Sequence, residues 1–240
     1  DATVNAMVTR SFERARAEAA KAEAAVMAGE PLGLLHGLPV GIKDLSDTGG
    51  IRTTYGSELF ADHVPENDER VVASVRKAGA IVLGKTNTPE FGTGANTRNS
   101  VFGATRNPFD PARTSGGSSG GSAVALACGM VPLATGSDHG GSLRTPAAYC
   151  GVTGYRPSPG LVPTERRGIA WTPSPVEGPM GRTVADAALL MAAGHGARFG
   201  AATPKQYLSL LGRPVVRHAA EALLASGHVD ALLPVCAAGE

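Results

Sequence analysis

The segment 66–89 places a helical pattern, a glycine, an apolar run and a polar loop in immediate succession. A helix is expected over 66–78, and Gly79 ends it. Three valines share one helix face and a polar residue can cap its start (Val71, Val72, Val75; Asn67 or Asp68). The run 80–83 is short and rich in branched residues, which is typical of a buried strand. This order of elements predicts an α/β fold.

Other segments extend this pattern. Apolar residues recur every three or four positions over 1–28, which predicts an amphipathic helix that ends at Gly29. Segment 122–128 is typical of a short helix of small residues, and 183–193 is alanine-rich and helical. The prolines between 157 and 179 indicate an irregular surface segment.

Charge and hydropathy exclude several classes of partner. The 22 Lys and Arg residues are balanced by 21 Asp and Glu, so we expect neither nucleic acid nor anionic lipid to bind. The longest apolar stretch, 122–134, is shorter than the ~18–20 residues that a membrane span needs. No secretory signal pattern occurs at the N-terminus, which favours the cytoplasm. Three cysteines without CxxC spacing are expected to be buried free thiols (Cys128, Cys150, Cys236).

Two glycine- and serine-rich segments adjoin apolar runs. Segment 116–122 precedes the apolar residues 123–128, and a second loop, 138–146, comes soon after the run 131–134. A flexible linker remains one interpretation of the first segment, but linkers are normally flanked by polar sequence. A phosphate-binding loop is disfavoured because no lysine follows the last glycine. We therefore expect both loops to lie against buried elements.

The first loop also fits the GxSxG pattern of the α/β-hydrolase nucleophile elbow, which would make Ser119 a nucleophile. That elbow needs a strand immediately before it. The preceding sequence NPFDPART holds two prolines, which remove donors from a strand ladder. No Asp and His follow at a suitable spacing, so the match is interpreted as accidental.

A serine on a glycine loop and a base other than histidine would suffice for nucleophilic catalysis. The sequence His139-Gly140-Gly141-Ser142 provides a loop whose N–H groups could converge on an oxyanion. Lys43 follows the apolar stretch 37–40, and burial would lower its pKa toward that of a usable base. A surface position remains the alternative for this lysine.

Five motifs together resemble the amidase signature family in order and spacing. They are GLPVGIKD, GKTNTPEFG, GGSSGGSA, GSDHGGSLRTPAAYCG and GPMGRTVADAALL. The resemblance covers residues 1 to about 190, which we take as one domain, 1–189. It implies an α/β fold with a mixed β-sheet core flanked by helices, of which this chain holds an incomplete part.

The resemblance also implies a Ser–cis-Ser–Lys triad. Carried over by motif, Ser142 is the nucleophile, Ser118 is the bridging serine after a cis peptide, and Lys43 is the base. The backbone N–H groups of four consecutive residues would bind the oxyanion (His139, Gly140, Gly141, Ser142). Arg144 is expected to pair with Asp138 or to meet the substrate.

The implied function is hydrolysis of the C–N bond of a small carboxamide through an acyl-enzyme, without a cofactor or a metal. Which amide is the substrate stays open, as does the oligomeric state, for which a homodimer is one candidate. An ammonia-dependent role on a charged transfer RNA would require partner subunits. An inactive truncation or fusion product is a further alternative.

A second resemblance begins near residue 190. Residues 190–240 are similar to the opening of 2-C-methyl-D-erythritol 4-phosphate cytidylyltransferase, which implies a C-terminal β-α-β fragment of a doubly wound nucleotidyltransferase. Four residues would surround the triphosphate of CTP (Gly194, Gly196, Arg198, Lys205). A nucleotide-binding chain of isoprenoid synthesis is therefore the alternative function. An ordinary glycine turn followed by a helix is the simpler interpretation of this segment.

Overall fold

The computed structural model describes residues 1–162, 164, 172, 174–193, 209–210 and 213–214. The chain divides into two units, Asp1–Gly194 and His195–Glu240. In the second unit, β9 (Ser209–Leu210) pairs antiparallel with β10 (Arg213–Pro214).

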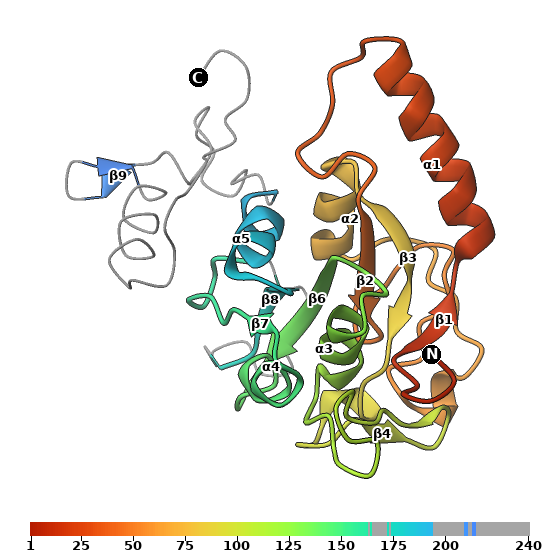
Figure 1. Ribbon diagram of the computed structural model, residues 1–240, viewed down its shortest axis with the longest axis vertical. Coiled ribbons are helices and arrows are strands. Elements are labelled where there is room, and N and C mark those ends of the chain that lie inside the picture. The colour runs from red at the N-terminus through yellow and green to blue at the C-terminus, as the bar shows by residue number, and fades with distance from the viewer. Residues whose placement is uncertain (163, 165–171, 173, 194–208, 211–212, 215–240) are drawn as a thin grey trace. The chain divides into compact units, whose positions relative to one another are not determined.

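A six-stranded mixed sheet forms the centre of the first unit, with strand order β1-β3-β2-β6-β8-β7 (Figure 1). The strands are β1 (Met7–Arg10), β2 (Pro39–Lys43), β3 (Ile81–Thr86), β6 (Leu133–Asp138), β7 (Thr153–Gly154) and β8 (Val176–Gly181). β2 pairs parallel with β3 and with β6, and the remaining pairs are antiparallel. A mixed sheet is the architecture expected from the sequence.

Helices cover both faces of the sheet, and the sheet separates two hydrophobic cores. These helices are α1 (Phe12–Met27), α2 (Arg70–Lys77), α3 (Gly120–Ala127), α4 (Arg144–Cys150) and α5 (Val184–Ala192). Leu133 lies in the core with residues of α2 and α5, whereas its neighbour Ala134 lies in the core with α3. Adjacent residues of a strand point to opposite faces, so the two cores are the two faces of one sheet.

Short elements complete the unit. Two 3₁₀ turns are formed by Glu58–Phe60 and Glu90–Gly92. β4 (Arg98–Asn99) pairs with β5 (Gly103–Ala104) in a separate hairpin.

The predicted helices 66–78 and 183–193 are confirmed with shorter bounds. Gly79 ends α2 with a φ of +90°, a conformation that glycine adopts without a steric penalty. The start of α2 differs from the prediction, because Glu69 is the N-cap and Asp68 instead accepts a hydrogen bond from Gly49 N at 2.7 Å. At α5, Thr183 and Asp186 form a reciprocal capping box.

The predicted helix over 1–28 is wrong in its first part. Met7 pairs with Thr86, and β1 adds an antiparallel edge strand to β3. Helix α1 begins only at Phe12, and Ala15 is its one buried residue among those described. The apolar spacing that suggested a single helix instead combines a partly buried edge strand with a largely exposed helix.

Two smaller predictions also differ from the structure. The irregular segment predicted for 157–179 ends earlier, because β8 runs from Val176 to Gly181 between β6 and β7. Cys150 is buried as expected, but Cys128 at the end of α3 is exposed. Cys236 lies outside the described residues.

Candidate active site

Lys43 ends β2, a strand in the interior of the sheet, and its side chain is fully buried. Its amine Nζ lies within hydrogen-bond distance of three hydroxyls: Ser118 Oγ at 2.7 Å, Ser119 Oγ at 3.0 Å and Ser137 Oγ at 2.8 Å. Its backbone N–H donates to Thr135 Oγ1 at 3.0 Å. Both ends of the residue are therefore held by hydroxyl groups.

The burial expected of Lys43 is observed, and it perturbs the amine. Burial lowers the pKa of Lys43 from 10.5 to about 7, against the opposing charges of Glu177 and Asp138. A buried ammonium loses its hydration, and three hydroxyl partners do not replace an anionic partner. Lys43 can therefore act as a proton acceptor near neutral pH.

The loop that precedes α3 contains a cis peptide bond between Gly117 and Ser118. This loop and the first turn of α3 are packed tightly. A Cβ atom on Gly121 would lie 2.2 Å from Asn87 N, and one on Gly117 would lie 2.9 Å from Asn96 N. The glycines permit close backbone approach, so the flexible-linker interpretation is wrong. The packing fixes the hydroxyl of Ser118 against Lys43.

Ser142 lies in the loop between β6 and α4, where it is half-buried. Its carbonyl accepts a hydrogen bond from Ser119 N at 3.2 Å, which joins the two glycine loops. Among the described residues, no hydrogen bond links Ser142 Oγ to Ser118 Oγ. The structure thus brings Ser118 against Lys43 and the backbone of Ser142 against the loop that holds Ser118 and Ser119. The hydroxyl of Ser142 is not hydrogen-bonded to that of Ser118 in this conformation.

Asp138 organises the loop that carries Ser142. Its buried carboxylate accepts hydrogen bonds from Gly141 N at 2.8 Å and Leu143 N at 3.1 Å. Arg144 binds the same carboxylate at 3.0 and 3.1 Å, so the predicted ion pair is present. Burial alone would raise the pKa of Asp138, but these hydrogen bonds hold it well below its usual range.

This arrangement changes the expected oxyanion site. The N–H of Gly141 already donates to Asp138 and is not free in this conformation. The N–H groups of His139, Gly140 and Ser142 have no acceptor among the residues described in the first unit. Those three groups could receive an oxyanion.

Two residues around this site were missed by sequence reasoning. Arg156 reaches Asp138 Oδ1 at 3.0 Å and the carbonyl of Ser174 at 2.9 Å, which joins the loop that carries Ser142 to the segment before β8. Glu177 pairs across the strands with Ser137, and its Oε2 is enclosed without a hydrogen-bond partner among the residues that the structure describes. Burial, and next the charge of Glu69, raise the pKa of Glu177 to about 8. No motif marks either residue.

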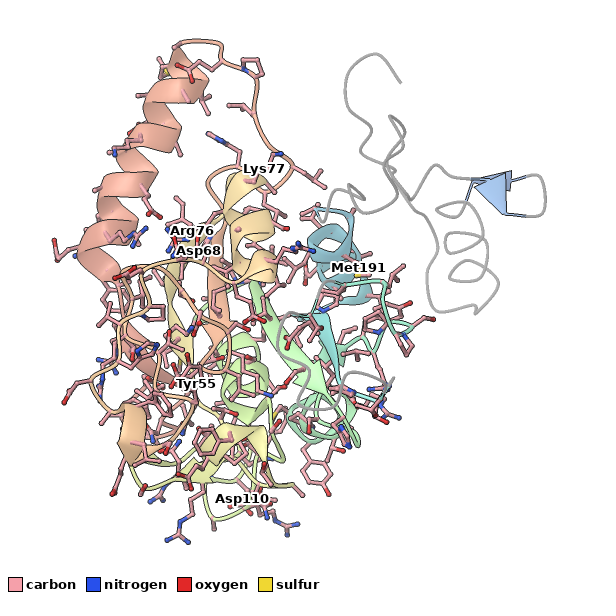
Figure 2. All side chains as sticks on the ribbon, turned by 180° about the vertical axis from the view of Figure 1, so that it is seen from behind. Tyr55, Asp68, Arg76, Lys77, Asp110 and Met191 are labelled. Atoms are coloured by element: carbon pink, nitrogen blue, oxygen red, sulfur yellow. The ribbon has the colours of Figure 1, made fainter. Side chains whose placement is uncertain are left out.

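A second buried lysine braces the loop that follows Lys43. Lys85 Nζ donates to Thr48 Oγ1 at 2.7 Å, to Thr53 Oγ1 at 3.1 Å and to the carbonyl of Ser46. Burial lowers the pKa of Lys85 to about 8. The same loop is tied to α2 through Asp68, whose Oδ2 lies 3.3 Å from Arg76 Nε (Figure 2).

Ser119 does not occupy a nucleophile elbow. Its hydroxyl is fully buried, and no strand occurs over residues 107–118, all of which are described. It contacts Lys43 instead, a contact that sequence reasoning did not anticipate.

The predicted nucleotide-binding residues lie outside the described part of the chain (Gly194, Gly196, Arg198, Lys205). Within the described part, no helix is long and apolar enough to cross a membrane. No group of three or more His, Cys, Asp or Glu side chains is placed there to hold a metal ion.

A family model, curated proteins and solved structures that resemble this chain all point to the same family. Residues 1–218 match the family model for Amidase. A glutamyl-tRNA(Gln) amidotransferase subunit of Heliobacterium modesticaldum is 44% identical over 219 residues, which cover 88% of this chain and 45% of that protein. A bacterial aryl acylamidase of the amidase signature family is 40% identical with a TM-score of 0.77, over 82% of this chain and 41% of that one.

A solved structure of the corresponding amidotransferase subunit from Thermotoga maritima is 44% identical with a TM-score of 0.60, over 68% of this chain and 36% of that one. The chain spans less than half the length of these relatives. The family match continues past residue 190, into the segment for which the sequence suggests a cytidylyltransferase fragment. On the extent of the family match and the identity of these relatives, the chain belongs to the amidase signature family.

Proposed function

We propose that this chain carries the catalytic centre of an enzyme that cleaves carboxamide C–N bonds through an acyl-enzyme. The observation that carries the proposal is the 2.7 Å contact between Lys43 Nζ and Ser118 Oγ, in a buried site where the pKa of Lys43 is about 7. A neutral amine against a serine hydroxyl is the general base that serine activation requires.

In this proposal Ser142 is the nucleophile and Ser118 passes the proton. Ser142 Oγ attacks the amide carbon, its proton moves to Ser118 Oγ, and the proton of Ser118 moves to Lys43 Nζ. The route requires Ser142 to turn its hydroxyl toward Ser118, a rotation about a single bond in a half-buried side chain.

The tetrahedral intermediate would place its oxygen at the N–H groups of His139, Gly140 and Ser142. The C–N bond then breaks, and the departing nitrogen takes the proton that Lys43 received, through Ser118. Water attacks the Ser142 ester and gives a proton through Ser118 to Lys43. The bond between the acyl carbon and Ser142 Oγ then breaks, Ser142 Oγ takes that proton back along the same route, and the carboxylic acid is released. Asp138 and Arg144 keep the loop in shape and take no part in proton transfer.

A second candidate rests on the names of the relatives. An amidotransferase passes amide nitrogen to an acceptor, and the matching relatives are named as subunits, which work together with other chains. The same acyl-enzyme would then release ammonia toward a partner's site. The cytidylyltransferase function of residues 190–240 stays a prediction from sequence.

A fluorophosphonate probe tests the proposal, because it reacts with an activated serine without needing the natural amide. We expect one label per chain, mapped to Ser142 by peptide analysis and absent from Ser142→Ala. Label on Ser119, or the same rate in Lys43→Met as in the parent chain, would contradict the proposal.

A further inference from the structure

The amine of Lys43 has three hydroxyl neighbours but, in its neutral form, only two hydrogens. Ser118, Ser119 and Ser137 lie 2.7, 3.0 and 2.8 Å from Nζ. A neutral amine can donate two hydrogen bonds and accept one through its lone pair. One of the three serines must therefore donate its O–H to Nζ while the other two accept from it.

Ser119 is not the donor. Its hydroxyl hydrogen is used in a bond to the carbonyl of Ser137 at 3.2 Å. Its oxygen accepts from Ser137 N at 3.2 Å, which closes a small ring between the two residues. Ser119 is fully buried, so water does not compete for its hydroxyl. It can only accept an N–H from Lys43.

The choice between Ser118 and Ser137 decides whether the proton relay can run. If Ser137 donates to the lone pair, Lys43 points an N–H at Ser118 and cannot take its proton. If Ser137 accepts, the lone pair faces Ser118. Ser137 is half-buried, so its hydroxyl hydrogen can reach solvent, whereas Ser118 is buried and its hydroxyl has no partner other than Nζ among the described residues. This difference favours turning the hydrogen of Ser137 away from Lys43 and that of Ser118 toward it.

We propose that Ser137 is a positioning residue which, together with Ser119, accepts both N–H bonds of neutral Lys43 and so reserves its lone pair for Ser118. This inference rests on the proposed function. When Lys43 takes the proton, its three N–H groups match the same three oxygens. The hydroxyl set thus fits both states of the base without a change of heavy-atom geometry.

Removing the hydroxyl of Ser137 has two effects that oppose each other. The ammonium form loses one of three acceptors, and hydrogen bonds to charged groups are the stronger ones, so the pKa of Lys43 falls further. The neutral form becomes more abundant, yet one N–H loses its acceptor and the amine can rotate away from Ser118. Labelling of Ser142 should slow although more of the base is free.

The test uses the full 240-residue chain and three variants. Ser137→Ala removes the hydroxyl, Ser137→Thr keeps it, and Ser122→Ala removes a buried hydroxyl that bonds Thr135 O at 2.8 Å rather than the amine. The rate of fluorophosphonate labelling is measured against pH, and Lys43 is titrated by NMR in protein labelled with ¹³Cε-lysine. Lys85, which does not contact Ser137, serves as an internal reference.

We expect Ser137→Ala to label Ser142 about ten- to a hundredfold more slowly and to move the Lys43 midpoint to lower pH. Lys85 should titrate as before, Ser137→Thr should restore both readings, and Ser122→Ala should leave the Lys43 midpoint unchanged. The charges nearest Lys43, those of Glu177 and Asp138, are the same in all of these variants.

An unchanged Lys43 titration in Ser137→Ala would overturn the inference, as would parental labelling rates. If the parent chain takes no label, the proposed function fails. The Lys43 titration then decides the role of Ser137 by itself, because it reports the hydroxyl–amine contact without any reaction.

Discussion

The burial of Lys43 predicts a steep dependence of Ser142 reactivity on pH. An amine with a pKa of about 7 is half neutral at pH 7, whereas an unperturbed lysine would be neutral in only about 4 molecules of 10,000. Keeping the charge buried therefore costs about 5 kcal/mol. The folded chain is less stable by about this amount, and Lys43 can accept a proton near neutral pH as a result.

The expected rates follow from the neutral fraction. With a pKa of about 7, that fraction falls from one half at pH 7 to about one hundredth at pH 5, so labelling should slow about fiftyfold. The assay is the rate of fluorophosphonate incorporation at each pH, with circular dichroism to show that the chain stays folded. Lys43→Met should label slowly at every pH.

Two results would refute this reasoning. The first is an equal labelling rate at pH 5 and pH 7 in folded protein, because a protonated Lys43 cannot accept a proton. The second is a pH dependence that survives in Lys43→Met, which would assign the titration to another group such as Glu177.

Three further predictions follow from the same site. Ser142→Ala should reduce amide hydrolysis roughly a thousandfold or more without unfolding the chain, whereas Ser122→Ala should keep its activity in the same assay. Asp138→Asn should lower the free energy of unfolding by about 2–4 kcal/mol in denaturant titrations, because two arginines lose their carboxylate. The lowered pKa of Asp138 contributes stability that is fully present above pH ~4 and is lost as the pH falls. The free energy of unfolding of Asp138→Asn should therefore fall less steeply below pH ~4 than that of the parent chain. An equally steep fall in both proteins would argue against that contribution. Deleting residues 195–240 should leave the labelling rate unchanged, since Lys43, Ser118 and Ser142 all belong to the first unit; a large loss would show that the second unit supports the site.

Local patterns predicted the parts of the fold that depend on local physics. Helix α2 ends at a glycine, and α5 occupies the alanine-rich segment 183–193, as the sequence indicated. The start of the chain was misjudged because Met7 belongs to a strand whose partner, β3, lies some eighty residues away. A pairing at that separation leaves no periodic signal in the segment itself.

In the candidate site, too, local sequence patterns predicted some residues, and contacts between distant segments determine the others. Lys43, Ser118 and Ser142 follow from motifs, because their neighbours are glycines and apolar residues in a distinctive order. Ser137 and Glu177 do not, since what distinguishes them is the register between β6 and β8. That register is set by packing of the two cores, and it cannot be read from either strand alone.

The glycines around Ser118 have a practical consequence for anyone who modifies this chain. A segment rich in glycine and serine is a customary place for a tag, a cleavage site or a circular permutation. Here an extra methyl at Gly121 would overlap the backbone of Asn87, so a saturation library should treat residues 117–121 as it treats core positions. Gly29 and Gly129 face open space, so new sequence is better inserted beside them, with the glycines kept because their positive φ strains any other residue.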